Sequence, residues 1–133
     1  MILGEVISAN ALVLTCKCDE DNVRKGRFIA ITDGENWPPL VHEADSGEKI
    51  GGTALKAGSN GDYIPVLLFG ITKMYAGGVV AAGDAVKTDG DGRAVKALAA
   101  DQGVEGGKAL MSAGEADDRF IVLVCPNNVG EGT

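Results

Sequence analysis

Two aspartates that alternate with glycines are the first candidates for metal chemistry, and they lie in the stretch GDAVKTDGDGRAV, residues 83–95. An EF-hand calcium loop needs oxygen ligands at positions 1, 3 and 5 and a bidentate glutamate at position 12. With Asp89 at position 1, Asp91 fits position 3. Position 5 would then be the cation Arg93 and position 12 would be Ala100, so the spacing argues against calcium. Asp and Gly are instead typical of tight turns, and we predict a β-hairpin in which AVKT leads in and RAVKA leads out.

Zinc is the next metal to consider, because the chain contains cysteines and one histidine, His42. A structural zinc site takes four ligands, usually as two close pairs. Cys16 and Cys18 form one such pair, but Cys125 and His42 do not form a second. The odd cysteine count, without a secretory signal, also argues against a disulfide framework. We interpret the cysteines as structural thiols, with Cys16 and Cys18 on the same side of a strand, and expect no metal.

Catalytic arrangements are missing from the sequence. The single histidine lies beside a Pro-Pro pair, and no GxSxG motif supplies a nucleophile. Neighbouring carboxylates such as Asp117 and Asp118 occur in polar turns, whereas acid–base catalysis needs a carboxyl group in a dry pocket. The glycine-rich GVVAAGDAVK lacks the GK[ST] ending of a phosphate-binding loop. We therefore predict that the protein is not an enzyme and has no catalytic residue and no cofactor.

The elements that carry these residues are short. The chain has 133 residues, 20 of them glycine, and its apolar runs are bounded by Gly, Asp or Asn. This pattern favours an all-β fold with little helix. The net charge is −7 without a basic stripe, so we expect neither nucleic acid nor a membrane surface as a partner. The N-terminus lacks the basic region of a signal peptide, which favours synthesis in a cytoplasm.

Both halves of the chain carry the same ordered pattern. KGRFIAITDGEN, GGTAL and GDYIPVLLF correspond in order to AGDAVKTDGDGR, GGKAL and DDRFIVLV. Chance similarity in a glycine-rich chain is the alternative, but three blocks in the same order favour a true repeat. We predict a small β-barrel or sandwich of pseudo-duplicated strand–turn–strand units, with copies at about 25–69 and 82–125. The single domain would span 1–125, with a flexible C-terminal tail at 126–133.

The run RFIVLVC near the C-terminus has two apolar faces. Phe120, Val122 and Val124 alternate with the equally apolar Ile121, Leu123 and Cys125. A strand that is apolar on both faces is typical of the centre of a barrel or sandwich. Farther upstream, residues 96–105 could form one or two helical turns.

Two segments outside the repeats are candidates for partner binding. Residues 35–41, ENWPPLV, combine the only tryptophan with two prolines that stiffen the loop. Trp37 could anchor an interface, or it could close one end of the barrel, and the sequence leaves both open. The N-terminal segment would expose apolar side chains unless a neighbouring subunit or another protein covers them. The predicted partner-binding residues are Ile2, Leu3, Val6, Trp37, Pro38 and Pro39.

The run YIPVLLFGITKMYAGGVVAAGDAVKTDGDGRAVKA resembles the small capsid cement, or decoration, proteins of tailed bacteriophages. The resemblance extends to GGTALKAGSNGDYIPV and GKALMSAGEADDRFIVLV and covers about residues 10–125, whereas NWPPLVHEADSGEK and TCKCDEDNVRK do not match. The matching residues are Gly70, Ile71, Lys73, Ala76, Gly77, Val79, Ala82, Gly83, Asp84, Val86, Thr88, Asp89, Gly92 and Arg93.

The resemblance implies a structural role. Such proteins bind the outer capsid surface of the virion, commonly as homotrimers, and clamp neighbouring subunits of the major capsid protein. The competing hypothesis is a small-molecule or carbohydrate-binding β-module without catalytic activity, for which Trp37, Tyr63 and Tyr75 are the available stacking residues. A non-catalytic subunit of an enzyme is a third hypothesis.

Overall fold

The computed structural model describes residues 11–33, 35–101 and 103–127. This part of the chain is built of β-strands, with one short 3-10 helix, so the predicted all-β fold is confirmed. The elements are β1 (Leu12–Cys18), β2 (Phe28–Asp33), β3 (Leu40–Glu43), β4 (Gly52–Ala54), β5 (Tyr63–Tyr75), β6 (Ala85–Thr88), β7 (Ala94–Lys96), η1 (Ala99–Asp101), β8 (Glu105–Ala109) and β9 (Arg119–Asn127).

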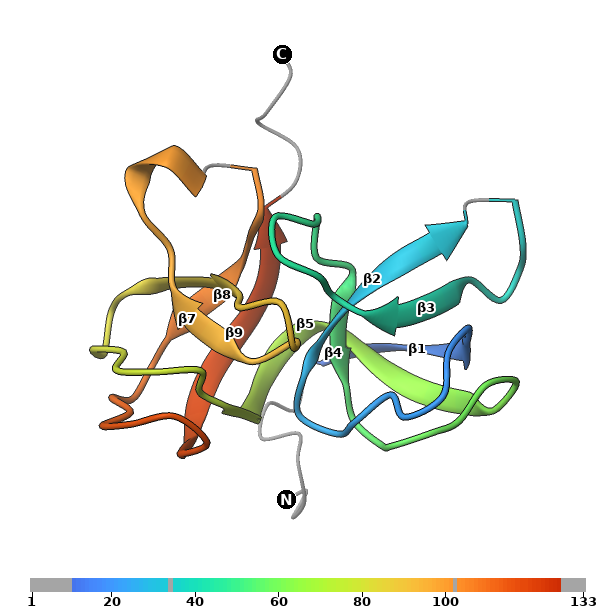
Figure 1. Ribbon diagram of the computed structural model, residues 1–133, viewed down its shortest axis with the longest axis horizontal. Coiled ribbons are helices and arrows are strands. Elements are labelled where there is room, and N and C mark those ends of the chain that lie inside the picture. Colours follow the sequence, from blue (N-terminus) through green and yellow to red (C-terminus); the bar gives the residue numbers. More distant parts are fainter. Residues whose placement is uncertain (1–10, 34, 102, 128–133) are drawn as a thin grey trace.

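The first half of the chain closes into a five-stranded barrel. β2 pairs antiparallel with β3 and β4, β4 pairs with β5, and β5 pairs with β1. A parallel contact between β1 and β3 completes the ring, with Lys17 opposite Leu40 and Cys18 opposite Val41. This barrel is the right-hand lobe of Figure 1. Closure leaves few free strand edges in this half.

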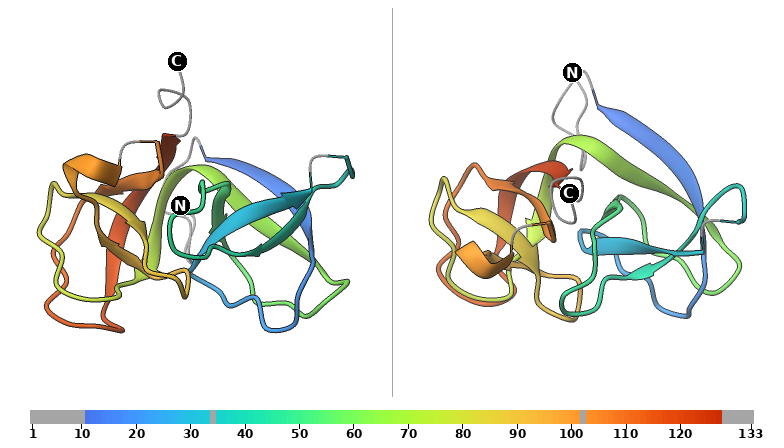
Figure 2. Two further views of the ribbon diagram at one scale, coloured as in Figure 1. Left: turned by 45° about the horizontal axis from the view of Figure 1, so that its top comes forward. Right: turned by 90° about the horizontal axis from the view of Figure 1, so that it is seen from above.

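The second half repeats the plan around the same long strand. β6 pairs antiparallel with β7 and β8, β8 pairs with β9, and β9 pairs with the C-terminal part of β5. A parallel bridge between Ala76 and Ala94 closes this second ring. β5 therefore serves as the last strand of one barrel and the first strand of the next, and Figures 1 and 2 show it running through both lobes.

Individual backbone hydrogen bonds recur at equivalent places in the two halves. The amide of Gly26 donates to the carbonyl of Ala54 at 2.8 Å, and the amide of Gly83 donates to that of Ala109 at 2.7 Å. The pseudo-duplicated architecture predicted from the sequence is therefore present. The C-terminal part of β5 has the same place in the second barrel as β1 has in the first. Each structural unit therefore begins one strand before the predicted repeats at 25–69 and 82–125: the first unit begins with β1 and the second with the C-terminal part of β5.

A shared core joins the two barrels. One cluster of buried apolar side chains fills the first barrel, whereas the other fills the second barrel and extends across the seam to residues of the first half. Phe28 lies at this seam with no exposed surface. A Cβ atom on Gly106 would lie 2.5 Å from its ring, so only glycine fits there. The two halves are thus interlocked units rather than separate modules.

Several smaller predictions are confirmed. β6 and β7 form the predicted hairpin around Asp89 to Gly92, and η1 provides one helical turn within 96–105. Cys16 and Cys18 are both buried on the inner face of β1.

The expected boundary of the C-terminal tail is wrong by two residues. β9 continues to Asn127, so residues 126 and 127 belong to the strand. Residues 128–133 lie outside the described part.

Candidate interaction surface

The β2–β3 loop presents its tryptophan to solvent. Trp37 is 78% exposed, so the possibility that it closes the barrel is excluded for the isolated chain. Pro38 is half-buried and Pro39 is buried, and the carbonyl of Pro39 accepts a 2.9 Å hydrogen bond from the amide of Lys17 in β1. Pro39 therefore anchors the loop rather than offering surface. Figure 1 shows this loop at the outer end of the first barrel.

The predicted partner-binding residues Ile2, Leu3 and Val6 lie outside the described residues. Their role stays a prediction. The described chain begins at Ala11, next to two apolar side chains that pair across β1 and β5, Leu12 (58% exposed) and Phe69 (46% exposed).

The outer face of β5, β9 and β8 carries an apolar surface that sequence reasoning missed. The inward residues of β9 are buried, as expected for a central strand, but Ile121 and Leu123 on its other face are only half-buried. Ile71 lies opposite Leu123, and the amide of Leu110 donates to the carbonyl of Ile121. The double apolar pattern of RFIVLVC was the signal for this surface. It predicts a covering layer, and no other described part of this chain fully supplies one.

Cations flank this apolar face. Lys73 lies opposite Ile121, and Lys108 lies opposite Leu123. A cavity of about 220 Å³ opens beside Ile121, and it is lined by Lys73, Met111, Arg119, Phe120 and Ile121. An apolar centre with a charged rim is the usual composition of a protein–protein interface.

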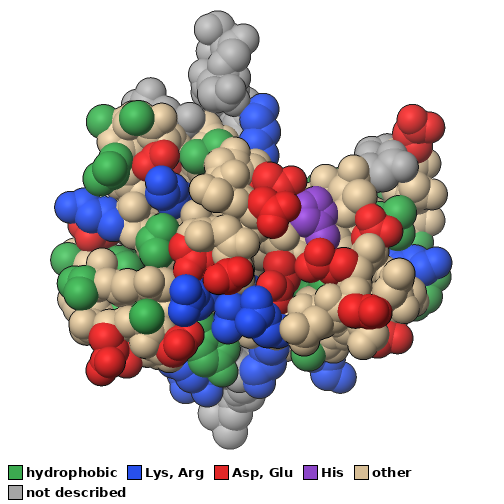
Figure 3. Space-filling view, in the orientation of Figure 1, with side chains coloured by type: hydrophobic (Ala, Val, Ile, Leu, Met, Phe, Trp, Pro, Cys, Tyr) green, Lys and Arg blue, Asp and Glu red, His purple; other side chains and the backbone are tan. Residues whose placement is uncertain are grey.

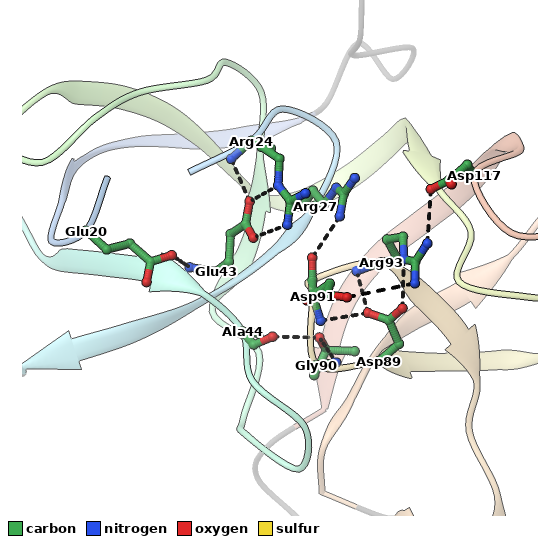
Figure 4. Close-up of polar contacts among 11 residues, drawn as sticks. Glu20, Arg24, Arg27, Glu43, Ala44, Asp89, Gly90, Asp91, Arg93 and Asp117 are labelled. Atoms are coloured by element: carbon green, nitrogen blue, oxygen red, sulfur yellow. Dashed lines mark hydrogen bonds and ion pairs between the residues drawn. The ribbon is translucent and has the colours of Figure 1, made fainter. Parts of the chain in front are cut away.

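The β6–β7 turn has a structural role that accounts for its acidic residues (Figure 4). Asp89 accepts hydrogen bonds from the amides of Asp91 and Arg93 and from Nε of Arg93, the last at 2.8 Å. Arg93 also donates to the carboxylate of Asp117 at 3.0 Å. The hydrogen bond to Asp117 and then the hydrogen bond to Asp89 raise the pKa of the Arg93 guanidinium. The oxygens that calcium would need are therefore engaged by a cation of the same chain.

The same turn docks against the first barrel. The amide of Phe28 donates to the carbonyl of Gly92 at 2.7 Å, and Oγ1 of Thr88 donates to the carbonyl of Ala44 at 2.8 Å. Nη1 of Arg27 reaches the carbonyl of Asp91 at 3.1 Å. The hairpin thus holds the two barrels in a fixed relation.

A charge pair lies beside this seam. Nε and Nη2 of Arg24 donate hydrogen bonds to the carboxylate of Glu43, at 2.9 and 2.8 Å, and these bonds raise the pKa of the Arg24 guanidinium. The amide of Glu43 in turn donates to Glu20 at 3.0 Å. The acidic triplet that begins at Asp19 is therefore partly used to stabilise β3.

Four further aspartates stabilise turns. Each accepts a hydrogen bond from the backbone amide of the residue three positions earlier, which is the turn-stabilising behaviour expected of Asp. These carboxylates belong to Asp62, Asp84, Asp101 and Asp118. For Asp101 the bond from Leu98, together with Lys87, lowers the pKa of the carboxyl group.

The structure brings together one group of potential metal ligands that sequence reasoning did not find. His42, Asp45 and Glu48 place one ligand atom each within 4.8 Å of one another, and Figure 3 shows the histidine among acidic side chains. His42 bonds to Thr32 at 2.7 Å and to Glu48 at 2.8 Å, and Glu48 also accepts from the amide of Asp45. These bonds explain the grouping without an ion. The three residues lie only a few positions apart in sequence, so the signal is a single histidine followed by two spaced carboxylates rather than a pair of cysteines.

The thiols do not form a nucleophilic site. Burial, with a smaller contribution from Cys18, raises the pKa of Cys16 to about 11, and burial also raises that of Cys18. Both thiols remain protonated near neutral pH, whereas nucleophilic attack and zinc binding need the thiolate. Cys125 is exposed on β9, and all three cysteines are free.

Comparisons with known proteins agree with this architecture. A family model described as phage cement protein matches residues 7–125. The solved structure of the head fiber gp8.5 N base in bacteriophage phi29 is similar, with a TM-score of 0.68 and 22% identity over 86% of this chain and 93% of that chain. No curated protein sequence matches. In the described part of the chain, no helix has the length and apolar character needed to cross a membrane.

Proposed function

Because the chain belongs to the phage cement protein family, we propose that it binds the outer surface of a phage head and stabilises the shell of major capsid protein. It would be made in the cytoplasm of the bacterial host and become part of the virion. Family membership supports a role in decorating the phage capsid. The observation that carries the finer proposal is the partly covered apolar face of β5, β9 and β8, where Ile121 and Leu123 are half-buried. Leu110 and Met111, which follow β8, are exposed beside it. An apolar face of this kind is typical of a surface that meets another protein.

The rigidity of the molecule suits this role. A cement protein must hold neighbouring shell subunits at a fixed spacing, so its own parts must not move relative to one another. The shared core around Phe28 and the hydrogen bonds from the β6–β7 turn to Ala44 and Phe28 supply that rigidity. We propose a homotrimer, because several weak contacts that act together bind far more tightly than one.

A structural role also accounts for the chemistry of the surface. The carboxylates described above cap turns, and two of the thiols are protonated and buried. These groups have places in the fold that need no substrate, which supports a protein without enzymatic activity.

A small-molecule or carbohydrate-binding module is the second candidate. One place for its ligand is the open depression of about 560 Å³ beside Tyr63, which also exposes Lys25 and Lys56. Sugar sites usually present several free aromatic rings. The guanidinium groups of Arg27 and Arg119 each lie 5.6 Å from the centre of the Tyr75 ring, which leaves that ring poorly placed for a sugar. The capsid-binding proposal is therefore favoured.

The test is to mix the purified protein with undecorated heads of the cognate phage, both expanded heads and precursor shells, and to image them. We expect stoichiometric density at local three-fold positions and greater resistance of decorated heads to heat. An unrelated acidic protein of similar size is the control. Absence of binding to both kinds of head would overturn the proposal.

A further inference from the structure

An exposed tryptophan and a cavity lie on different barrels of the molecule. Trp37 is on the loop at the outer end of the first barrel, and the cavity beside Ile121 is on the second barrel. Figures 1 and 2 show the β2–β3 loop and β9 well separated along the longest axis. The tryptophan of one chain therefore cannot reach the cavity of that same chain, but it can reach the cavity of another copy.

The cavity has the size for one side chain. At about 220 Å³ it is smaller than the roughly 300–1,000 Å³ typical of small-molecule sites. Met111 and Ile121 provide an apolar lining, and Met111 is 50% exposed at the entrance. A thioether and an arginine are both favourable neighbours for an indole ring, through sulfur–aromatic and cation–π contacts.

The charges of the two sites are complementary. Lys73 and Arg119 line the cavity, whereas Glu35 is exposed two residues before Trp37 on the loop. A loop that carries one acidic and one aromatic side chain matches a cavity with basic and apolar walls. Complementary charges of this kind select the partner and fix its orientation.

We propose that Trp37 of one copy inserts into the cavity between Lys73, Met111 and Ile121 of a second copy, with Glu35 directed toward the cations of its rim. The contact joins two different surfaces, so it is heterologous, and it closes into a ring of three when successive copies are related by a rotation of one third of a turn. This inference rests on the proposed homotrimer and assigns its interface. The buried Pro39, bonded through its carbonyl to the amide of Lys17, fixes the end of the loop beside Trp37 for that contact.

Sedimentation of the full chain and two complementary variants tests the contact. Trp37→Ala keeps an intact cavity, and Met111→Glu keeps an intact tryptophan but blocks the cavity with a charge. We expect a trimer for the unaltered chain and a loss of self-association of at least about thirtyfold for each variant alone. Both altered side chains are at least half exposed, so thermal unfolding should show an intact fold.

The mixture of the two variants gives the sharpest result. Only Trp37 of the Met111→Glu chain can enter the cavity of the Trp37→Ala chain, so a 1:1 mixture should form dimers and no closed ring. A charge exchange, Glu35→Lys with Lys73→Glu, should restore at least part of the association that Glu35→Lys alone removes. Leu98→Ala removes another exposed apolar side chain, 61% exposed, and should leave the trimer intact.

Several outcomes would overturn the contact. They are a monomeric unaltered chain, a trimer that survives either single variant, full trimers in the mixture, or an equal loss in Leu98→Ala. A Trp37→Ala trimer that no longer binds heads would place the tryptophan against the shell and also overturn it. Head binding is measured separately on the unaltered chain, so failure of this contact and failure of the cement function are distinguished.

Discussion

The amide of Phe28 donates a 2.7 Å hydrogen bond to the carbonyl of Gly92, and this bond ties the first barrel to the hairpin of the second. Gly92 approaches so closely because it has no side chain. A Cβ atom there would lie 2.9 Å from Cβ of Arg27 and 3.0 Å from the carbonyl oxygen of Phe28, and its φ is +79°. The joint between the two barrels therefore depends on a glycine.

Gly92→Ala should destabilise the protein by about 2–5 kcal/mol, because the cost of a left-handed alanine adds to that of a steric clash. Gly47→Ala is a matched control, since Gly47 has a φ of +80° and nothing within 4 Å of the added atom. It should lose only about 1–2 kcal/mol. Chemical denaturation measures both, and equal losses would show that the close approach at the seam does not matter.

Asp89→Ala should cost about 1–3 kcal/mol, because it leaves the amides of Asp91 and Arg93 and Nε of Arg93 without their shared acceptor. Asp91→Ala is the control. The side chain of Asp91 is 66% exposed, and its carboxylate lies 3.9 Å from Nη2 of Arg93, which is too far for a hydrogen bond. Its loss should therefore cost less than about 0.5 kcal/mol.

A chelator should leave the melting temperature of the unaltered chain within about a degree of its value without chelator, because Arg93 already neutralises Asp89. A large drop would revive calcium binding at the turn. A drop that persists in His42→Ala but disappears in Asp89→Ala would assign the ion to this turn rather than to the group around His42.

Much of this hairpin could be predicted from the sequence, because its chemistry is local. Gly at positive φ and Asp that bonds nearby amides are properties of the turn itself. The docking of the turn on Phe28 could not be predicted, since it joins residues that are far apart in sequence. The shared role of β5 was also missed, because β1 and the C-terminal part of β5 occupy equivalent places without similar sequences.

The interaction surface was predictable only in part. Alternation in RFIVLVC identified a strand with two apolar faces, but it could not tell whether the chain itself covers the face of Ile121 and Leu123. The exposure of Trp37 was likewise open, because an aromatic beside prolines suits a barrel end and an interface equally. Both questions concern what lies opposite a side chain in space, which local sequence does not encode.

The buried thiol of Cys16 should make stability depend on alkaline pH. Its pKa is raised from 9.0 to about 11 in the folded chain, so the folded state holds the proton more tightly than the unfolded state does. Its contribution is present in full below pH 9 and is lost as pH rises toward about 11. Denaturation at a series of pH values should show this loss, and Cys16→Ala should show less of it.

Thiol labelling at pH 8 provides an independent check of the same burial. In the native chain Cys125 should react quickly, whereas Cys16 and Cys18 should react only after unfolding. Rapid labelling of all three cysteines in the native chain would contradict the burial of β1.

Trp37→Ala should change the stability of the isolated chain by less than about 0.5 kcal/mol, because the side chain is 78% exposed. A core tryptophan would cost about 3–5 kcal/mol. Thermal unfolding at a concentration low enough to give monomers makes this comparison, with Phe28→Ala as the control for a buried ring. A loss as large as that of Phe28→Ala would show that the loop folds inward.

Deletion of residues 2–6 should impair trimer formation or head binding while the isolated chain still melts normally. The physical reason is that Ile2, Leu3 and Val6 are apolar, whereas the described strands begin only at Leu12 and form closed rings without them. A variant with serine at these three positions keeps the length of the segment and separates the effect of the side chains from that of the backbone. Sedimentation, head binding and thermal unfolding are measured on each. If both variants form trimers and decorate heads as the unaltered chain does, the segment has no part in either contact.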